Sequence, residues 1–141
     1  MQNRTLAILK PDCLERKLTG KAIDFILNKG FSIKALRMLR LSRREAEEFY
    51  AVHKDKPFFK DLVRYMTSGP CITMVLERNN AVLSFRAAIG ATDPQKAKEN
   101  TFRRLYAENT KRNTIHGSDS EENAQKEIAF FFPLKEIITC H

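Results

Sequence analysis

The segment Asn113-Thr114-Ile115-His116-Gly117-Ser118-Asp119 is the stretch around which the rest of this sequence can best be organised. It combines one imidazole with a glycine and several short polar side chains, and two basic residues, Lys111 and Arg112, come just before it. Histidine titrates near neutrality and can serve as a nucleophile, a general base or a metal ligand. A single histidine in a polar turn can equally well satisfy a loop, so the rest of the chain has to decide between these readings.

The segment that leads into this stretch, residues 91–113, is long, polar and basic, with Phe102, Leu105 and Tyr106 as its main apolar side chains. Such a segment inside a compact domain is usually a binding loop or a disordered insert. Because it runs directly into the histidine stretch, we favour binding. The formal net charge of +8 suits an anionic ligand, which could be a nucleotide, a nucleic acid or a membrane headgroup.

Four short apolar runs predict strands, at residues 4–9, 31–35, 71–76 and 127–132. The third run is apolar almost throughout, as is typical of a central strand that is covered on both faces. The continuation of the second run through residues 36–41 fits either a strand or a helix.

Helices are predicted between these runs, at residues 20–30, 42–55, 58–66, 80–89 and 120–126. The second of them should begin with a capping box, because Ser42 is followed three residues later by Glu45. Helices interspersed among about four strands predict an α+β fold in which helices cover one face of the sheet. We expect a single domain over residues 1–141, without repeats or linkers.

The composition, 43% hydrophobic and 30% charged over 141 residues, is that of an ordinary globular domain. The longest apolar runs are too short to span a bilayer, and no signal peptide is visible. Three scattered cysteines, Cys13, Cys71 and Cys140, fit reduced thiols in a cytoplasmic protein. The sequence contains no P-loop, no G-x-G-x-x-G turn and no paired ligands for a transition metal.

The histidine stretch carries the pattern N-x-x-H-G-S-D, and four shorter motifs accompany it in order along the chain. They are Ile8-Leu9-Lys10-Pro11-Asp12, Lys56-Pro57-Phe58-Phe59, Ser68-Gly69-Pro70 and Ile89-Gly90-Ala91-Thr92-Asp93-Pro94. Each is weak alone, but five motifs in order at compatible spacing are specific. From Thr5 to Phe132 the sequence resembles the nucleoside diphosphate kinase family.

This resemblance implies a ping-pong transfer of a phosphoryl group. His116 would attack the γ-phosphate of a nucleoside triphosphate, mainly ATP, carry it as phosphohistidine and pass it to a nucleoside diphosphate. Glu127 would orient the imidazole through its other nitrogen, and Ser118 would be linked to that carboxylate.

The resemblance also implies the nucleotide contacts. The phosphates would be held by Lys10, Arg86, Thr92 and Arg103, with Tyr50 beside the histidine, Asn113 on the ribose and phosphate, Phe58 stacked on the base and Leu62 near it. Stacking and sugar contacts ignore the identity of the base. Mg²⁺ would arrive with the nucleotide, and Asp119 would reach it only through water.

The fold implied by the resemblance is a ferredoxin-like, four-stranded antiparallel sheet with helices on one face. The protein would be a homo-oligomer, either a tetramer or a hexamer. The sequence departs from the family pattern within residues 98–110, where Asn100 replaces a glycine and Thr110 replaces an apolar residue that packs on the base.

Two alternatives remain open from the sequence. A nucleic-acid-binding protein would also suit the charge and a ferredoxin-like sheet, and such binding could be a secondary activity of a kinase. The strand at residues 71–76 is aliphatic, however, and lacks the aromatic side chains of an RNA-binding strand. A catalytically inactive assembly module would require a lost catalytic residue, and none is missing.

Overall fold

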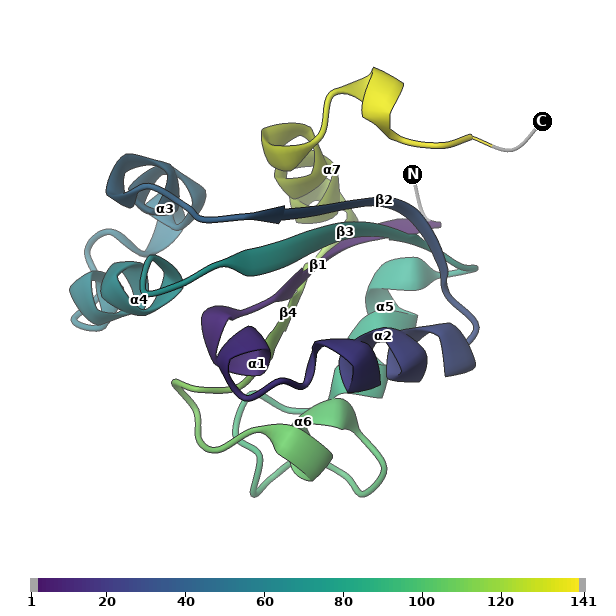
Figure 1. The fold of residues 1–141 in the computed structure, drawn as a ribbon, viewed down its shortest axis with the longest axis horizontal. Helices are drawn as coiled ribbons and strands as arrows, with labels where there is room; N and C mark the ends of the chain where they lie inside the picture. Colours follow the sequence, from purple (N-terminus) through teal and green to yellow (C-terminus); the bar gives the residue numbers. More distant parts are fainter. Residues whose placement is uncertain (1–2, 140–141) are drawn as a thin grey trace.

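A computed structural model describes residues 3–139 of the chain. Its four strands form one antiparallel sheet in the order β2-β3-β1-β4 (Figure 1). The strands are β1 (Arg4–Leu9), β2 (Ser32–Leu39), β3 (Cys71–Glu77) and β4 (Ile115–Gly117). β1 pairs with β3 along its whole length and with β4 on its other side. The predicted central position of residues 71–76 is therefore confirmed, and the ambiguous residues 36–39 extend β2.

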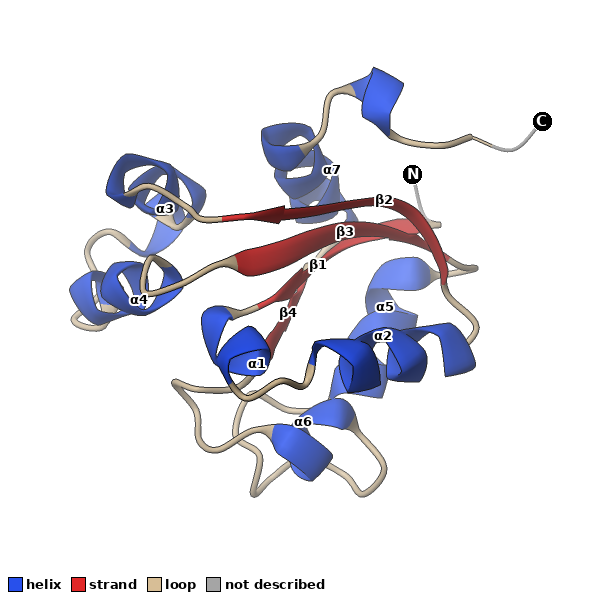
Figure 2. Cartoon of the chain, in the orientation of Figure 1, coloured by secondary structure: helices blue, strands red, loops and turns tan. Residues whose placement is uncertain are grey.

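Seven α-helices and two 3₁₀ turns connect and follow these strands in the described part of the chain (Figure 2). The α-helices are α1 (Pro11–Glu15), α2 (Thr19–Asn28), α3 (Arg43–Phe49), α4 (Phe59–Met66), α5 (Ala81–Ile89), α6 (Phe102–Tyr106) and α7 (Glu121–Phe131). The 3₁₀ turns are η1 (Ala51–His53) and η2 (Leu134–Glu136). The capping box at the start of α3 is present, with Glu45 N donating to Ser42 Oγ at 3.1 Å and Ser42 N donating to Glu45 Oε1 at 2.9 Å.

Helices cover both faces of the sheet, which corrects the prediction of helices on one face only. α2 and α5 lie on one side and α7 on the other (Figure 1). Along β1, Ala7 and Leu9 join the core with α2 and α5, whereas Leu6 and Ile8 join the core with α3, α4 and α7. Because successive side chains of a strand point to opposite faces, a strand that is apolar at every position requires cover on both.

The run at residues 127–132 was wrongly predicted as the last strand, because residues 127–131 belong to α7. Ser120 Oγ caps this helix by accepting from Asn123 N at 3.1 Å. A short apolar run cannot be assigned to a strand or a buried helix by periodicity alone. The fourth strand is β4, in which His116 pairs with Ile8. This register places the histidine on an edge strand beside β1.

Residues 91–113 are ordered around α6 in this structure, and the segment is tied to the body of the domain. Asn100 has φ of 66°, a left-handed conformation that suits glycine best and that asparagine tolerates. Lys111 Nζ donates to Asp61 Oδ2 of α4 at 3.1 Å.

Cys13 and Cys71 are free and buried, and Cys140 lies outside the described residues. Among residues 3–139, no helix has both the length and the apolar content needed to cross a membrane.

Candidate active site

A cavity of about 590 Å³ brings together every residue predicted for the site except Ser118, which is buried behind it. One side of the cavity is formed by α3, η1 and α4, which supply Tyr50 at the end of α3, Phe58 at the start of α4, and Leu62. The residues that line it from the rest of the fold are Lys10, Arg86, Thr92, Arg103, Asn113, His116, Asp119 and Glu127.

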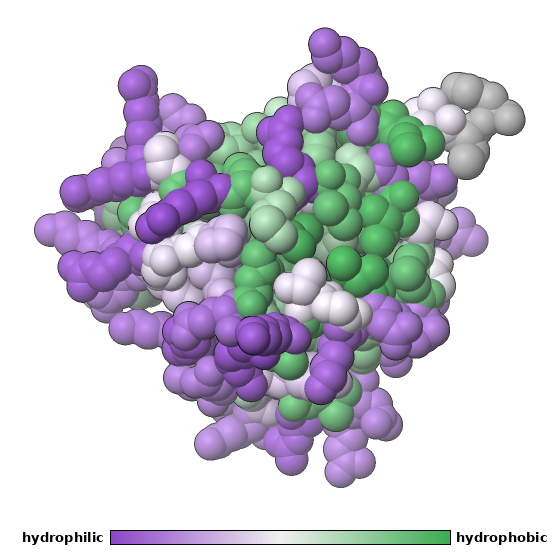
Figure 3. Space-filling model, viewed as in Figure 1, coloured by the Kyte–Doolittle hydropathy of each residue, from purple (hydrophilic) through white to green (hydrophobic). Residues whose placement is uncertain are grey.

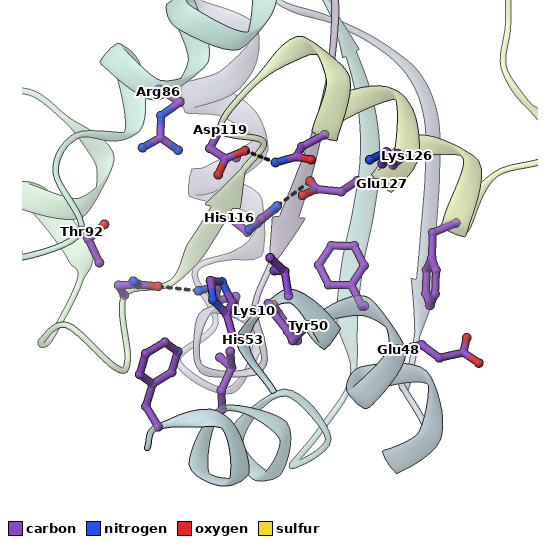
Figure 4. A pocket seen from close by; sticks show the side chains of 18 of the residues that line it. Lys10, Glu48, Tyr50, His53, Arg86, Thr92, His116, Asp119, Lys126 and Glu127 are labelled. Atoms are coloured by element: carbon purple, nitrogen blue, oxygen red, sulfur yellow. Dashed lines mark hydrogen bonds and ion pairs between the residues drawn. The ribbon is translucent and has the colours of Figure 1, made fainter. Parts of the chain in front are cut away.

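His116 is held on one side by a carboxylate, as Figure 4 shows. Its Nε2 lies 2.8 Å from Glu127 Oε1, and the two side chains are only 19% and 20% exposed. Ser118 Oγ donates to the same Glu127 oxygen at 2.8 Å, and Leu6 N donates to Ser118 Oγ at 3.3 Å. Because the carboxylate accepts a hydrogen bond from Nε2–H, the lone pair of the neutral ring lies on Nδ1. The neutral ring therefore keeps one nitrogen that this hydrogen bond does not use and that can act as a nucleophile.

Cations converge on the same cavity from different elements. Lys10 follows β1 and is only 7% exposed, and its Nζ donates to Asn113 Oδ1 at 2.8 Å. Burial, reinforced by the positive charge of Arg103, lowers the pKa of Lys10 to about 7. Arg103 itself donates to Gly90 O at 3.0 Å and to Ile115 O at 2.7 Å. Burial and the neighbouring Arg86 lower the pKa of Arg103 to about 10. An anion bound in this cavity would stabilise the positively charged forms of both Lys10 and Arg103.

Tyr50 adds a buried hydroxyl to the same cavity. Its side chain is 7% exposed, and its Oη has no hydrogen-bond partner among the described residues. Burial raises the pKa of Tyr50, so the phenol stays protonated and can donate a hydrogen bond to a ligand.

The far end of the cavity is more apolar and more open. Phe58 is 45% exposed, and its ring centroid lies 5.5 Å from that of His53. In the sequence, no polar motif like that of His116 surrounds His53. Most of its neighbours in the cavity come from other elements of the fold. An exposed phenyl ring beside a cavity provides a flat surface for stacking.

Several cavity residues were missed by the sequence analysis, namely Glu48, Phe49, Val52, His53, Asn123, Lys126 and Phe130. Asn123, Glu127 and Phe130 are spaced by four and three residues, which places them on one face of α7. Reading residues 120–131 as a single helix would have revealed this set.

Metal ligands are sparse around the cavity. Residues 3–139 contain no group of three or more His, Cys, Asp or Glu side chains placed to hold a metal ion. Asp119 lines the cavity, and its Oδ1 accepts from Asn123 Nδ2 at 2.6 Å. One carboxylate cannot hold a magnesium ion alone, but it can support an ion that a ligand brings.

Residues 3–137 match the family model described as nucleoside diphosphate kinase. The chain belongs to the nucleoside diphosphate kinase family. It is 52% identical over 135 residues to a nucleoside diphosphate kinase of Chlorobium limicola, with 96% of each chain covered. It is 53% identical to that of Chlorobaculum tepidum, again with 96% of each chain covered.

Solved structures of nucleoside diphosphate kinases confirm the predicted α+β sheet. The Aquifex aeolicus enzyme superposes with a TM-score of 0.94 at 44% identity, covering 96% of this chain and 99% of its own. The Halobacterium salinarum enzyme in complex with CDP also has a TM-score of 0.94, at 38% identity, covering 100% of this chain and 94% of its own. The family and the ferredoxin-like architecture are therefore as the motifs indicated.

Proposed function

We propose that this chain is a nucleoside diphosphate kinase that transfers the γ-phosphate of a nucleoside triphosphate, mainly ATP, to a nucleoside diphosphate through phosphohistidine on His116. The observation that carries the proposal is the pairing of His116 Nε2 with Glu127 at 2.8 Å in a cavity otherwise rich in cations. A ring held in this way offers Nδ1 to the cavity. Phosphoryl transfer depends mainly on such positioning and on neutralising charge.

In the first half-reaction, the Nδ1 lone pair attacks the γ-phosphorus, and the bond to the bridging oxygen of the donor breaks. The electron pair leaves with the nucleoside diphosphate, and the Nε2 proton stays hydrogen-bonded to the Glu127 carboxylate. The second half-reaction reverses these steps with the acceptor. Glu127 stabilises the positive charge that the ring acquires, and Ser118 keeps the carboxylate in place through its 2.8 Å hydrogen bond.

The remaining cavity residues would bind the nucleotide. Lys10, Arg86, Thr92 and Arg103 would hold the phosphates, Tyr50 would donate to them, Asn113 would contact the ribose and phosphate, and Phe58 with Leu62 would contact the base. Because the open end of the cavity offers a flat ring, binding there would tolerate different bases.

Enzymes of this family require a divalent metal ion, and we propose Mg²⁺. The residues fit an ion that enters with the nucleotide, since Asp119 lines the cavity and could support the ion through water. When bound, the ion would neutralise part of the charge of the phosphates.

A homo-oligomer, tetramer or hexamer, is also part of this proposal. β2 is an edge strand, and Leu36 and Met38 on it are 48% and 60% exposed. Figure 3 shows apolar side chains gathered on the face that β2 presents to the viewer. An edge strand with exposed apolar residues requires cover. We propose further that residues 1–141 form one domain that acts in the cytoplasm.

The test is transfer of label from γ-labelled ATP in the presence of magnesium. The protein should form an acid-labile, alkali-stable phosphoprotein that discharges onto added GDP. His116→Ala should not be labelled, whereas His53→Ala, which removes the other imidazole of the cavity, should still carry label. An unlabelled wild type, or equal labelling of His116→Ala, would refute the mechanism.

Nucleic-acid binding is a second candidate, as a secondary activity, because the net charge of +8 favours polyanions. It would appear as an affinity for DNA or RNA that falls steeply with salt and is not altered by ATP.

A further inference from the structure

The aromatic residue Phe49, at the end of α3, contacts the imidazole of His116 directly. The two ring centroids are 5.7 Å apart and the rings are inclined at 71°, an edge-to-face arrangement. Phe49 also packs against Tyr50 at 4.9 Å, Phe130 at 5.4 Å and Phe131 at 5.2 Å. The ring that touches the histidine is therefore itself fixed on three other sides.

The place of Phe49 in the fold relates it to the carboxylate as well as to the imidazole. Phe130 and Phe131 follow Glu127 by three and four residues on α7, which is one helical turn. Phe49 thus contacts both the imidazole and the helix that supplies its hydrogen-bond acceptor. This position agrees with the low exposure of both partners, 19% for His116 and 20% for Glu127.

A single hydrogen bond does not fix an imidazole, because the terminal torsion of histidine is broad and roughly two-fold. Rotation of the ring by half a turn would exchange Nε2 for a carbon and Nδ1 for another carbon. The hydrogen bond to Glu127 would then be lost, and no nitrogen would face the phosphate. An aromatic ring in contact with the imidazole restricts this rotation, and it also keeps water from competing for the carboxylate.

We propose that Phe49 is a positioning residue, which locks the His116 ring in the rotamer and tautomer that leave Nδ1 free for the phosphoryl group. The inference rests on the proposed function, since it assigns the residue that prepares the nucleophile. Phe49 does not contact the phosphate in this scheme. It acts only through the ring of His116 and through the Glu127 hydrogen bond.

The test compares Phe49→Leu with Phe131→Leu. The first keeps an apolar side chain of similar bulk but loses the flat ring on His116. The second removes a ring from the same aromatic cluster, in contact with Phe49, and leaves the contact between Phe49 and His116 in place. Thermal unfolding of both variants shows how much each substitution weakens the cluster.

Two measurements then separate positioning from packing. Single-turnover phosphorylation by ATP should be about tenfold slower in Phe49→Leu, with unchanged affinity for ADP, because only ring orientation is lost. Nitrogen NMR of His116 should show the proton on Nε2 in the wild type and a mixture of the two tautomers in Phe49→Leu. Phe131→Leu should resemble the wild type in both measurements.

A Phe49→Leu variant that phosphorylates at the wild-type rate with a single tautomer would overturn the inference. So would a Phe131→Leu variant that is slowed as much, since the effect would then come from the stability of the cluster. A wild type that never becomes labelled would instead refute the proposed function, so the two failures are distinguishable.

Discussion

Removing the buried charge of Lys10 should change how the stability of the protein depends on pH. Lys10 Nζ is buried beside Asn113, and burial together with Arg103 lowers its pKa from the ordinary 10.5 to about 7. Between these two values the unfolded chain keeps a proton that the folded chain has released. Stability rises with pH wherever the unfolded state binds more protons, so the free energy of unfolding should rise from pH 7 upward.

The size of the effect follows from the shift. One pH unit within the window corresponds to at most about 1.4 kcal/mol, and the partial protonation near pH 7.5 reduces this to about 1 kcal/mol between pH 7.5 and 8.5. Lys10→Met should lack this rise. The free energy of unfolding of the wild type minus that of Lys10→Met should therefore increase by about 1 kcal/mol over the same range.

The assay is urea unfolding at several pH values, with the midpoint and slope fitted for both proteins. The range stops at pH 8.5 because burial raises the pKa of Cys13 to about 12 and that of Cys71 to about 11. Above that pH their unfolded thiols would ionise first and lower the stability of both proteins. Lys126→Met, which removes an exposed lysine from the rim of the same cavity, is the matched control. Because it keeps Lys10, its free energy of unfolding should rise with pH as that of the wild type does.

Parallel stability curves for the wild type and Lys10→Met would refute the reasoning, because they would mean that Lys10 titrates alike in both states. A further check uses the proposed ligand. Bound nucleotide phosphates should favour the protonated lysine, so the affinity for ADP should fall as the pH rises from 7 to 8.5.

Three other substitutions follow from the same structure. Glu127→Gln removes the negative charge that faces His116 Nε2, and single-turnover phosphorylation should slow by about 100-fold while ADP binding is retained; unchanged turnover would exclude this role. Gly117→Ala places a Cβ 2.8 Å from Phe85 Cδ2, so the free energy of unfolding, followed by thermal unfolding, should fall by about 1–3 kcal/mol. An unaltered midpoint would contradict this close contact. Ser42→Ala removes the capping box of α3 and should cost about 1 kcal/mol in urea unfolding, with Ser42→Asp retaining most of the stability.

The sequence by itself determined the elements whose signals are local. β1 and β3 were predictable because each is a compact apolar run, and the start of α3 was predictable because a capping box needs only residues three apart. The chemical types at the site were also visible, since the histidine motif and its companions fix the family without any knowledge of distances.

The tertiary structure decided which residues meet. His116 reaches Glu127 only because residues 121–131 form a helix that packs on β1, whereas the apolar run at its end was compatible with a strand. Lys10 and Asn113 are 103 positions apart and meet at 2.8 Å because β1 and β4 are paired.

The contact of Phe49 with the histidine depends in the same way on how α3 packs against α7 and the sheet. Periodicity indicates which face of an element is buried, but it does not indicate which other element covers that face. His116 could therefore be predicted from the chain as the candidate nucleophile, but the orientation of its ring and the residues that hold it follow from packing between segments distant in sequence.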